Sequence, residues 1–158
     1  MAKKLSHVGP RKQARMVDVG GKRVTRRRAR ARGSVRLHRD TVRLLAGPGV
    51  PKGSVIETAR LAGIQAAKRT DELIPLCHAL QLTHVDVACS LTDQGVDIEA
   101  TVEARGRTGV EMEALTAVAV AALTVYDICK AVDRGASIEA IRLMEKSGGR
   151  SGHYRRRE

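Results

Sequence analysis

The sequence predicts an α+β protein with a ferredoxin-like fold, in which two helices cover one face of an antiparallel sheet. Four segments alternate apolar and polar residues as strands do, and two longer apolar segments lie between them. Apart from one short helix, the order along the chain is strand, helix, strand, strand, helix, strand. This order is the split βαβ arrangement. With 158 residues, the chain is long enough for one domain with a buried core.

The first strand is expected in the segment VTRRRARARGSVRL, which begins at Val24 and has one face of small apolar residues and one face of arginines. In this topology the first strand lies beside the third. Arg28, Arg30 and Arg32 are therefore expected to face three carboxylates across the ladder, Asp97, Glu99 and Glu103. A short helix is expected near residues 41–45, and a longer one opens at Ser54 and ends near Thr70.

The second half of the chain predicts a hairpin, a long helix and a last strand. Two alternating runs, residues 83–91 and 95–104, are separated by turn residues. The long helix ends near Gly135 and contains thirteen consecutive uncharged residues, 114–126. Thr108 and Glu111 predict a capping box at its start. Residues 137–144 are the last expected strand, and KSGGRSG, residues 146–152, is expected to form a glycine-rich loop.

The charge of the chain is concentrated at its two ends. The net charge is +12, but residues 1–43 contain fifteen Lys and Arg against two Asp, and residues 150–158 contain four Arg and one Glu. The residues between them carry a net charge of −4. Basic ends of this kind are usually solvated arms. With two tyrosines and no Phe or Trp, the chain also lacks aromatic platforms for single-stranded bases, so a nucleic-acid partner is not expected.

The cysteine count and the hydropathy predict a cytoplasmic protein. The three cysteines are odd in number and lack C-x-x-C spacing, which argues against disulfides and a zinc site and for a reducing compartment. No apolar run of membrane-spanning length and no signal sequence is apparent, so no membrane association is expected.

Asp127 and Lys130 stand out near the end of the long helix. An anion in the last turns opposes the helix dipole, so helix stability does not explain Asp127. Three residues apart, the two side chains share a face, either as a structural ion pair or as an acid/base couple. Lys52 lies in a Pro-Lys-Gly turn beside a helix N-terminus, a suitable place for a phosphate. Lys68, Lys146 and His78 are each compatible with a surface or structural role or with a functional one.

Several long motifs resemble the molybdenum cofactor biosynthesis protein C family, whose members are cyclic pyranopterin monophosphate synthases. They are LAGIQAAKRTDELIPLCHAL, TGVEMEALTAVAVAALTVYDICKAV, MVDV and KSGGRSG, in that family's order and continuous from about Met16 to Gly152. The resemblance implies a ferredoxin-like fold and homohexamers built from dimers. No cofactor or protein-bound metal is expected, and the presence of a divalent ion on the triphosphate is left open. In the reaction of this family a 3′,8-cyclised dihydro-GTP, supplied by an upstream radical enzyme, becomes cyclic pyranopterin monophosphate with release of pyrophosphate.

The resemblance also assigns roles to residues. Asp127, Lys130 and Lys52 match catalytic positions. The expected substrate-binding residues are Leu76, Cys77, His78, Glu111, Met112, Glu113, Lys68 and Lys146. Two neighbouring ammonium groups would depress each other's pKa and move one lysine towards a neutral base, but which lysine does so is left open. Ala79 departs from the family, where proline is more usual after the histidine; this concerns the rigidity of the loop.

The motifs divide the chain into three parts. Residues 16–152 form the expected catalytic domain, residues 1–15 a basic arm that is mobile or only locally ordered, and residues 153–158 a basic tail. Glu113 and Asp127 are fourteen residues apart, or roughly 21 Å along one helix, so an active site shared between two subunits is expected. The rival interpretations are a basic nucleic-acid-binding module and a structural assembly protein whose ion pair closes an interface.

Overall fold

The computed structural model describes residues 5–49 and 52–157, and it describes residues 52–54 by their backbone only. The strands form one antiparallel sheet in the order β2-β3-β1-β4-β5. They are β1 (Thr25–Arg36), β2 (Leu82–Thr92), β3 (Gly95–Gly106), β4 (Ser137–Ser147) and β5 (Tyr154–Arg155). The predicted α+β class and the position of the first strand beside the third are confirmed.

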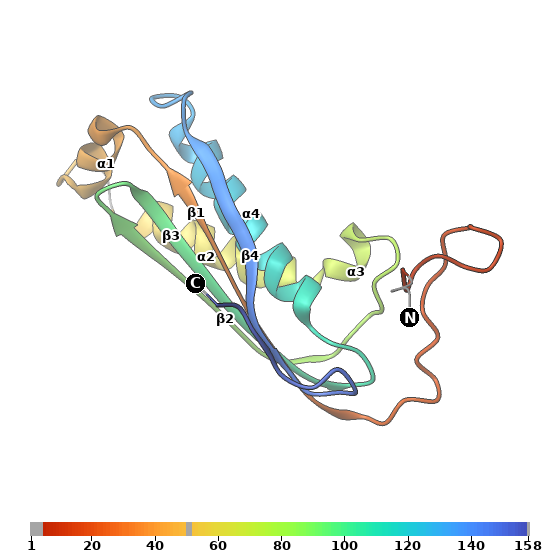
Figure 1. Cartoon of the computed structure of the whole chain (residues 1–158). Helices are drawn as coiled ribbons and strands as arrows, with labels where there is room; N and C mark the ends of the chain where they lie inside the picture. The colour runs from red at the N-terminus through yellow and green to blue at the C-terminus, as the bar shows by residue number, and fades with distance from the viewer. Residues whose placement is uncertain (1–4, 50–51, 158) are drawn as a thin grey trace.

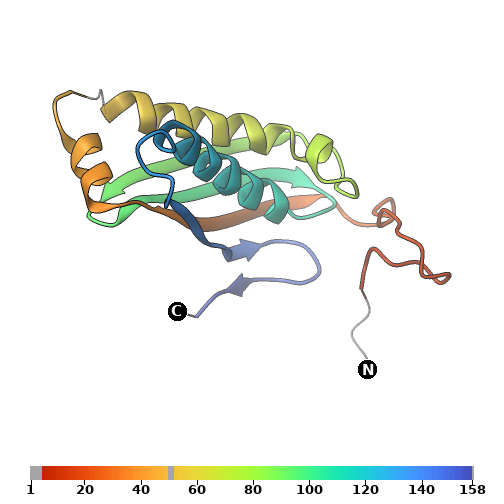
Figure 2. The same cartoon turned by 90° about the horizontal axis from the view of Figure 1, so that it is seen from above.

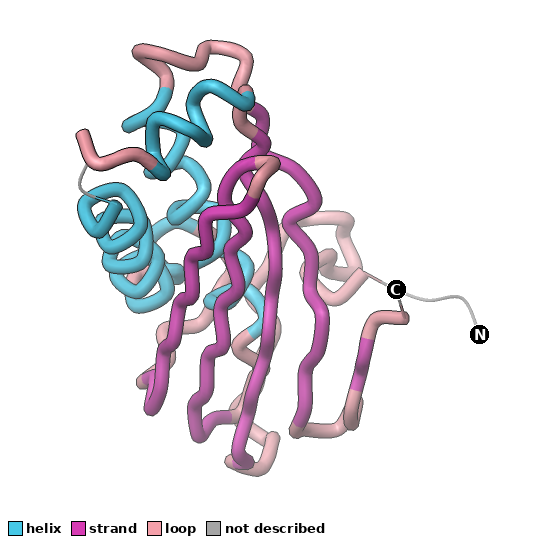
Figure 3. Tube along the Cα trace, turned by 90° about the vertical axis from the view of Figure 1, so that its left-hand side faces the viewer, coloured by secondary structure: helices cyan, strands magenta, loops and turns pink. Residues whose placement is uncertain are grey.

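Two long helices, α2 (Lys52–Lys68) and α4 (Glu111–Cys129), pack side by side on one face of the sheet, and the other face is uncovered in the single chain (Figures 1 and 3). Two shorter helices, α1 (Arg39–Ala46) and α3 (Thr70–Leu73), flank α2. Helix α4 contacts β1, β3 and β4, while α2 contacts β2.

Small residues fill the core between α4 and the sheet. Ala29 and Ala31 of β1 are fully buried, as are Ala117 and Ala121 of α4. By length and composition α4 also resembles a membrane-spanning helix, but half of its apolar window is buried within the protein. The helix is apolar because it lies in this core.

The arginine face of β1 is neutralised largely as the sequence predicts. Arg28 contacts Glu103 at 3.3 Å and Arg32 pairs with Glu99. Arg30 lies 3.8 Å from Glu99 and 3.4 Å from Glu145 of β4, a partner that the sequence did not predict. The expected role of Asp97 is wrong, because the strand register places it opposite Ser34.

Several element boundaries differ from the expected ones. Helix α2 begins at Lys52, so this lysine lies in the first turn of the helix and not in a turn before it. Val110 is the N-cap of α4 and makes no side-chain cap bond, so the predicted capping box is absent. Strand β4 continues to Ser147 because it pairs with β1 as far as Arg28, with two register shifts.

The chain after β4 turns back on itself. Tyr154 and Arg155 pair with Lys146 and Glu145 to form β5 at the edge of the sheet (Figure 2). This second hairpin brackets the glycine-rich segment between Ser147 and Tyr154, and it thereby holds that segment beside the end of β4. The basic tail expected from the sequence thus contains a short strand.

Candidate active site

A pocket of about 620 Å³ lies at the N-terminal end of α4, and we call it the α4 pocket. It lies where β1 begins and where β3 and β4 end, because these strands are antiparallel. It is lined by Ser6, His7, Val17, Val19, Lys22, Arg27, Leu76, Cys77, His78, Leu80, Arg107, Thr108, Gly109, Glu111, Met112, Glu113, Lys146, Ser147, Gly148, Arg150 and Ser151.

Most of the predicted substrate-binding residues meet in this pocket. The loop between α3 and β2 supplies residues 76–78, the first turn of α4 supplies residues 111–113, and the end of β4 supplies Lys146. Lys68, at the end of α2, instead lines a separate shallow hollow with Ile64 and residues of β2. Three segments that lie far apart in the sequence therefore line one pocket, and Lys68 is not part of its lining.

Glu113 is the buried acid of the α4 pocket. It is 4 % exposed, and among the residues that the structure describes its Oε2 atom has no hydrogen-bond partner. The pKa of its carboxyl is raised to about 7, mainly by burial and in smaller part by the nearby charges of Glu111 and Asp71, against the lowering effect of a backbone hydrogen bond. A carboxyl with this pKa can both release and accept a proton near neutral pH.

Cys77 is a thiol and not a thiolate in this environment. Burial raises the pKa of the Cys77 thiol, and the charges of Glu113 and Asp71 act in the same direction. Because the thiolate is the nucleophilic form, Cys77 is suited to packing and hydrogen bonding and not to covalent catalysis.

The lining of the α4 pocket also contains a set of basic side chains, which we call the basic wall. Its cations are Lys22, Arg27, Arg107, Lys146 and Arg150. Of these five cations, only Lys146 is among the substrate-binding residues expected from the sequence. Arg27 is 7 % exposed, and its Nε atom donates a hydrogen bond to the carbonyl of Gly106 at 3.2 Å. One sequence signal could have identified it: Arg27 is the single charged residue in the alternating small-residue face of β1.

The glycine-rich segment after β4 makes room for Arg27. Gly148 and Gly149 have φ values of +94° and +75°, which side chains other than that of glycine rarely allow. A Cβ atom at position 149 would lie 1.7 Å from Arg27 Nη1. Glycine at this position therefore lets the backbone lie directly against the guanidinium. Because Glu113 lines the same pocket, the α4 pocket suits an anionic ligand that also exchanges protons.

Asp127 and Lys130 lie at the opposite end of α4 from the pocket. The Lys130 Nζ atom donates to Asp127 Oδ1 at 2.5 Å, and both side chains are exposed, by 58 % and 70 % respectively. The hydrogen bond to Asp127, with its charge, raises the pKa of Lys130. In the single chain Lys130 is therefore held as a cation. The predicted catalytic partner Lys52 has its side chain outside the described residues.

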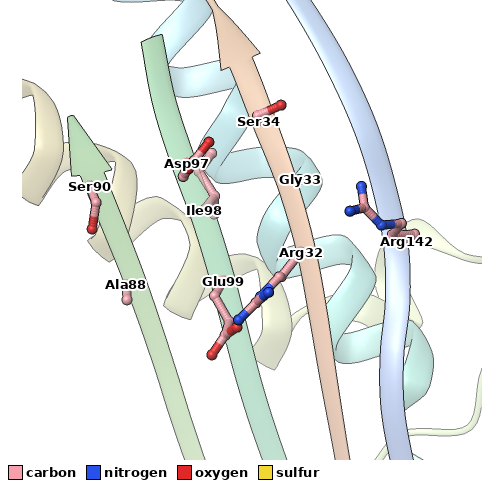
Figure 4. Close-up of a pocket in the computed structure, with 9 residues that line it drawn as sticks. All are labelled: Arg32, Gly33, Ser34, Ala88, Ser90, Asp97, Ile98, Glu99 and Arg142. Carbon is pink, nitrogen blue, oxygen red and sulfur yellow. The ribbon is translucent and has the colours of Figure 1, made fainter. Parts of the chain in front are cut away.

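A second hollow, of about 420 Å³, lies on the uncovered face of the sheet (Figure 4). Arg32 points towards Glu99 across the floor of this hollow, and Asp97, Ser34 and Arg142 surround it. No predicted site residue lines it. Among the described residues there is also no cluster of three His, Cys, Asp or Glu side chains that could hold a metal ion.

Comparison with known proteins agrees with the motifs. The sequence model described as the MoaC family matches residues 16–149. A cyclic pyranopterin monophosphate synthase of Roseiflexus sp. (strain RS-1) is 59 % identical, covering 95 % of this chain and 96 % of the relative. The protein of that name from Chloroflexus aggregans is 56 % identical over 98 % of this chain and 94 % of its own length. Cyclic pyranopterin monophosphate synthase 3 of Mycobacterium tuberculosis is 59 % identical, over 98 % of this chain and 88 % of its own length.

We expect Gly149→Ala to weaken the binding of inorganic triphosphate, because the new methyl group displaces the Arg27 guanidinium. Losing a charge-assisted hydrogen bond corresponds to about a tenfold rise in Kd, measured by titration calorimetry. The matched control is Gly152→Ala. Gly152 also has a left-handed φ, of +64°, but nothing lies within 4 Å of the position of its Cβ. Equal effects of the two substitutions would show that Arg27 does not bind the anion.

We expect Glu113→Gln to stabilise the protein above neutral pH. The pKa of the Glu113 carboxyl is about 7 in the folded protein against an ordinary value of 4.5. The folded state therefore holds the proton more tightly, and wild-type stability falls as pH rises from about 4.5 to 7. In urea denaturation, Glu113→Gln should lack this loss, which is on the order of 2 kcal/mol. The control Glu57→Gln, at an exposed position, should show the same dependence of unfolding free energy on pH as the wild type. If the wild type and Glu113→Gln showed the same dependence on pH, the raised pKa of Glu113 would be contradicted.

Proposed function

The chain belongs to the MoaC family, and on this premise we propose that it is a cyclic pyranopterin monophosphate synthase of molybdenum cofactor biosynthesis. Its substrate is (8S)-3′,8-cyclo-7,8-dihydroguanosine 5′-triphosphate, and its products are cyclic pyranopterin monophosphate and pyrophosphate. The observation that carries the proposal is the α4 pocket, in which seven predicted substrate-binding residues from three separate segments meet a basic wall.

The basic wall binds the triphosphate. Arg27 presents a planar fork of N–H donors that suits phosphate oxygens, and Lys146 at the end of β4 adds a point charge. Arg27 is fixed in place by its bond to the Gly106 carbonyl and by the backbone at Gly149. A cation that is already ordered loses little conformational entropy when the phosphate arrives.

The part of the α4 pocket near Glu111 and Glu113 receives the guanine-derived ring. Converting the purine system to a pterin requires several proton transfers and no net oxidation, so positioned acids and bases are sufficient. Glu113 has a pKa of about 7 and the position for one of these transfers. Leu76, Cys77 and His78 line the same pocket and orient the ring.

Asp127, Lys130 and Lys52 carry out the remaining acid/base steps. Because Asp127 keeps Lys130 charged, Lys130 is suited to donating a proton or stabilising developing negative charge. This leaves the role of neutral base to Lys52. Asp127 orients Lys130 and keeps it charged through their 2.5 Å contact.

The active site is shared between two subunits. Asp127 and Lys130 are exposed at one end of α4, roughly 21 Å from Glu113 at the other. An exposed apolar side chain, Leu123, lies on α4 between these ends, and Met112 is exposed beside the pocket. Antiparallel pairing of two α4 helices across a twofold axis buries these side chains and brings the pair of one chain to the pocket of the other. Such dimers assemble into a homohexamer in the cytoplasm.

The decisive experiment measures pyrophosphate release from the cyclised nucleotide by the purified protein. In that assay Asp127→Asn, Lys130→Ala and Lys52→Ala should each lower kcat by at least about 10²-fold, the range for losing a general acid or base, while melting temperatures change little. Arg60→Ala is the matched control, since it breaks another exposed ion pair of the same i, i+3 spacing, with Glu57 at 3.0 Å. If Lys130→Ala and Arg60→Ala behave alike, the Asp127–Lys130 pair is structural.

Mixing two inactive variants tests the shared site. Glu113→Ala and Asp127→Asn each damage a different half, so subunit exchange should restore one intact site per mixed dimer and therefore measurable activity. Exchange is verified with a mass label on one variant, and each variant alone is the control. Verified exchange without recovered activity would place both residues in the site of a single chain.

A further inference from the structure

The N-terminal arm, which the motifs place outside the catalytic domain, has a defined local structure from Leu5 onwards. Val8 and Ala14 form an antiparallel bridge. The Gly9 N–H donates to the Gln13 carbonyl at 2.8 Å, and the Arg15 N–H donates to the His7 carbonyl at 3.0 Å. These bonds close residues 7–15 into a small loop. The loop lies at the end of the molecule where α3 is found (Figures 1 and 2).

This loop brings two residues of the arm to the α4 pocket. Ser6 and His7 line it, together with Val17 and Val19 from the extended segment that leads to β1. Val17 and Val19 are half-buried and alternate with exposed neighbours, so this segment presents one side to the pocket. Residues 6–19 thus supply a wall that the rest of the fold does not provide.

The His7 ring is oriented by its own loop. Its Nδ1 atom lies 3.2 Å from the carbonyl oxygen of Arg15. A carbonyl oxygen only accepts hydrogen bonds, so Nδ1 carries the proton in this contact. In the neutral ring the lone pair is then at Nε2, and a hydrogen bond from Nδ1 to a backbone carbonyl is a common way of fixing the tautomer of a functional histidine.

We propose that the N-terminal arm is a wall of the active site and that His7 binds the substrate through Nε2, accepting a hydrogen bond from an N–H or O–H group of the cyclised nucleotide. The inference rests on the proposed function for the identity of the substrate. It adds a second histidine to the pocket beside His78, and it makes the arm part of the substrate-binding machinery.

Two substitutions at His7 separate the substrate bond of Nε2 from the structural bond of Nδ1 to the Arg15 carbonyl. His7→Asn retains an N–H donor near the Nδ1 position, which can still bond the Arg15 carbonyl, but it has no group in place of Nε2. His7→Gln places its amide near the Nε2 position. We expect His7→Asn to lower kcat/KM about tenfold, mainly through KM, and His7→Gln to recover part of the loss. Arg11→Ala, in the same loop but outside the pocket lining, should match the wild type.

The outcomes distinguish the inference from the proposed function. If the wild-type protein releases no pyrophosphate, the proposed function fails. If the wild type is active and His7→Asn equals it, only the role of His7 fails. Binding through Nε2 would also be overturned if His7→Asn and His7→Gln were equally impaired and both lowered kcat without changing KM.

Limited proteolysis gives a readout that does not depend on turnover. Trypsin cleaves after Arg11 and Lys12, both in the arm loop. In the Asp127→Asn background, where turnover is slow, the cyclised nucleotide should slow this cleavage at least about tenfold if the arm closes on the substrate. Adding His7→Asn should remove most of the protection. Cleavage that is unaffected by the nucleotide would show that the arm does not contact it.

Discussion

The close packing of α4 against the sheet and against α2 is the constraint on which the rest of the structure depends. Two glycines show how tight it is. A Cβ at Gly33 of β1 would lie 2.8 Å from Val118 Cγ1, and a Cβ at Gly63 of α2 would lie 2.9 Å from the carbonyl oxygen of Ala117. Native packing of this density leaves the helix no freedom to slide or rotate. Both ends of α4 are consequently fixed relative to the sheet, and both ends carry residues to which we assign roles in the proposed reaction.

At its N-terminal end, this rigidity sustains an unfavourable arrangement. Glu113 lies in the first turn, where the helix dipole favours a carboxylate, yet burial dominates and raises the pKa of the carboxyl to about 7. Among the described residues, the buried Oε2 atom of Glu113 has no hydrogen-bond partner, which costs stability, and a mobile helix end would let the carboxyl move into solvent. The fixed helix prevents this relaxation and so preserves a group that can transfer protons. In the same pocket, the Arg27 guanidinium is held by a strand carbonyl and by the glycine backbone.

At its C-terminal end, the same helix presents Asp127 and Lys130 to solvent. A pair this exposed contributes little to stability, because water screens it and the side chains lose entropy in forming it. In the proposed dimer, a second chain covers this pair. The uncovered face of the sheet has a related character: its arginines and carboxylates neutralise one another, which leaves a face without strong net charge that another subunit can cover. The residues to which we assign roles therefore lie at the two ends of α4 and in the N-terminal arm, and not in the centre of the sheet.

The sequence by itself determined the architecture and most of the pocket. Strand and helix periodicities reflect which side chains meet the core, so the element order and its ferredoxin-like topology predicted β1 beside β3 and the Arg28–Glu103 and Arg32–Glu99 pairs. The motifs identified residues 76–78 and 111–113, which do meet. Only the tertiary structure decided that Arg27 and His7 join them and that Lys68 lies elsewhere. The physical reason is that burial, close approach to a glycine backbone and the path of an irregular arm depend on contacts between distant segments, which no periodicity along the chain records.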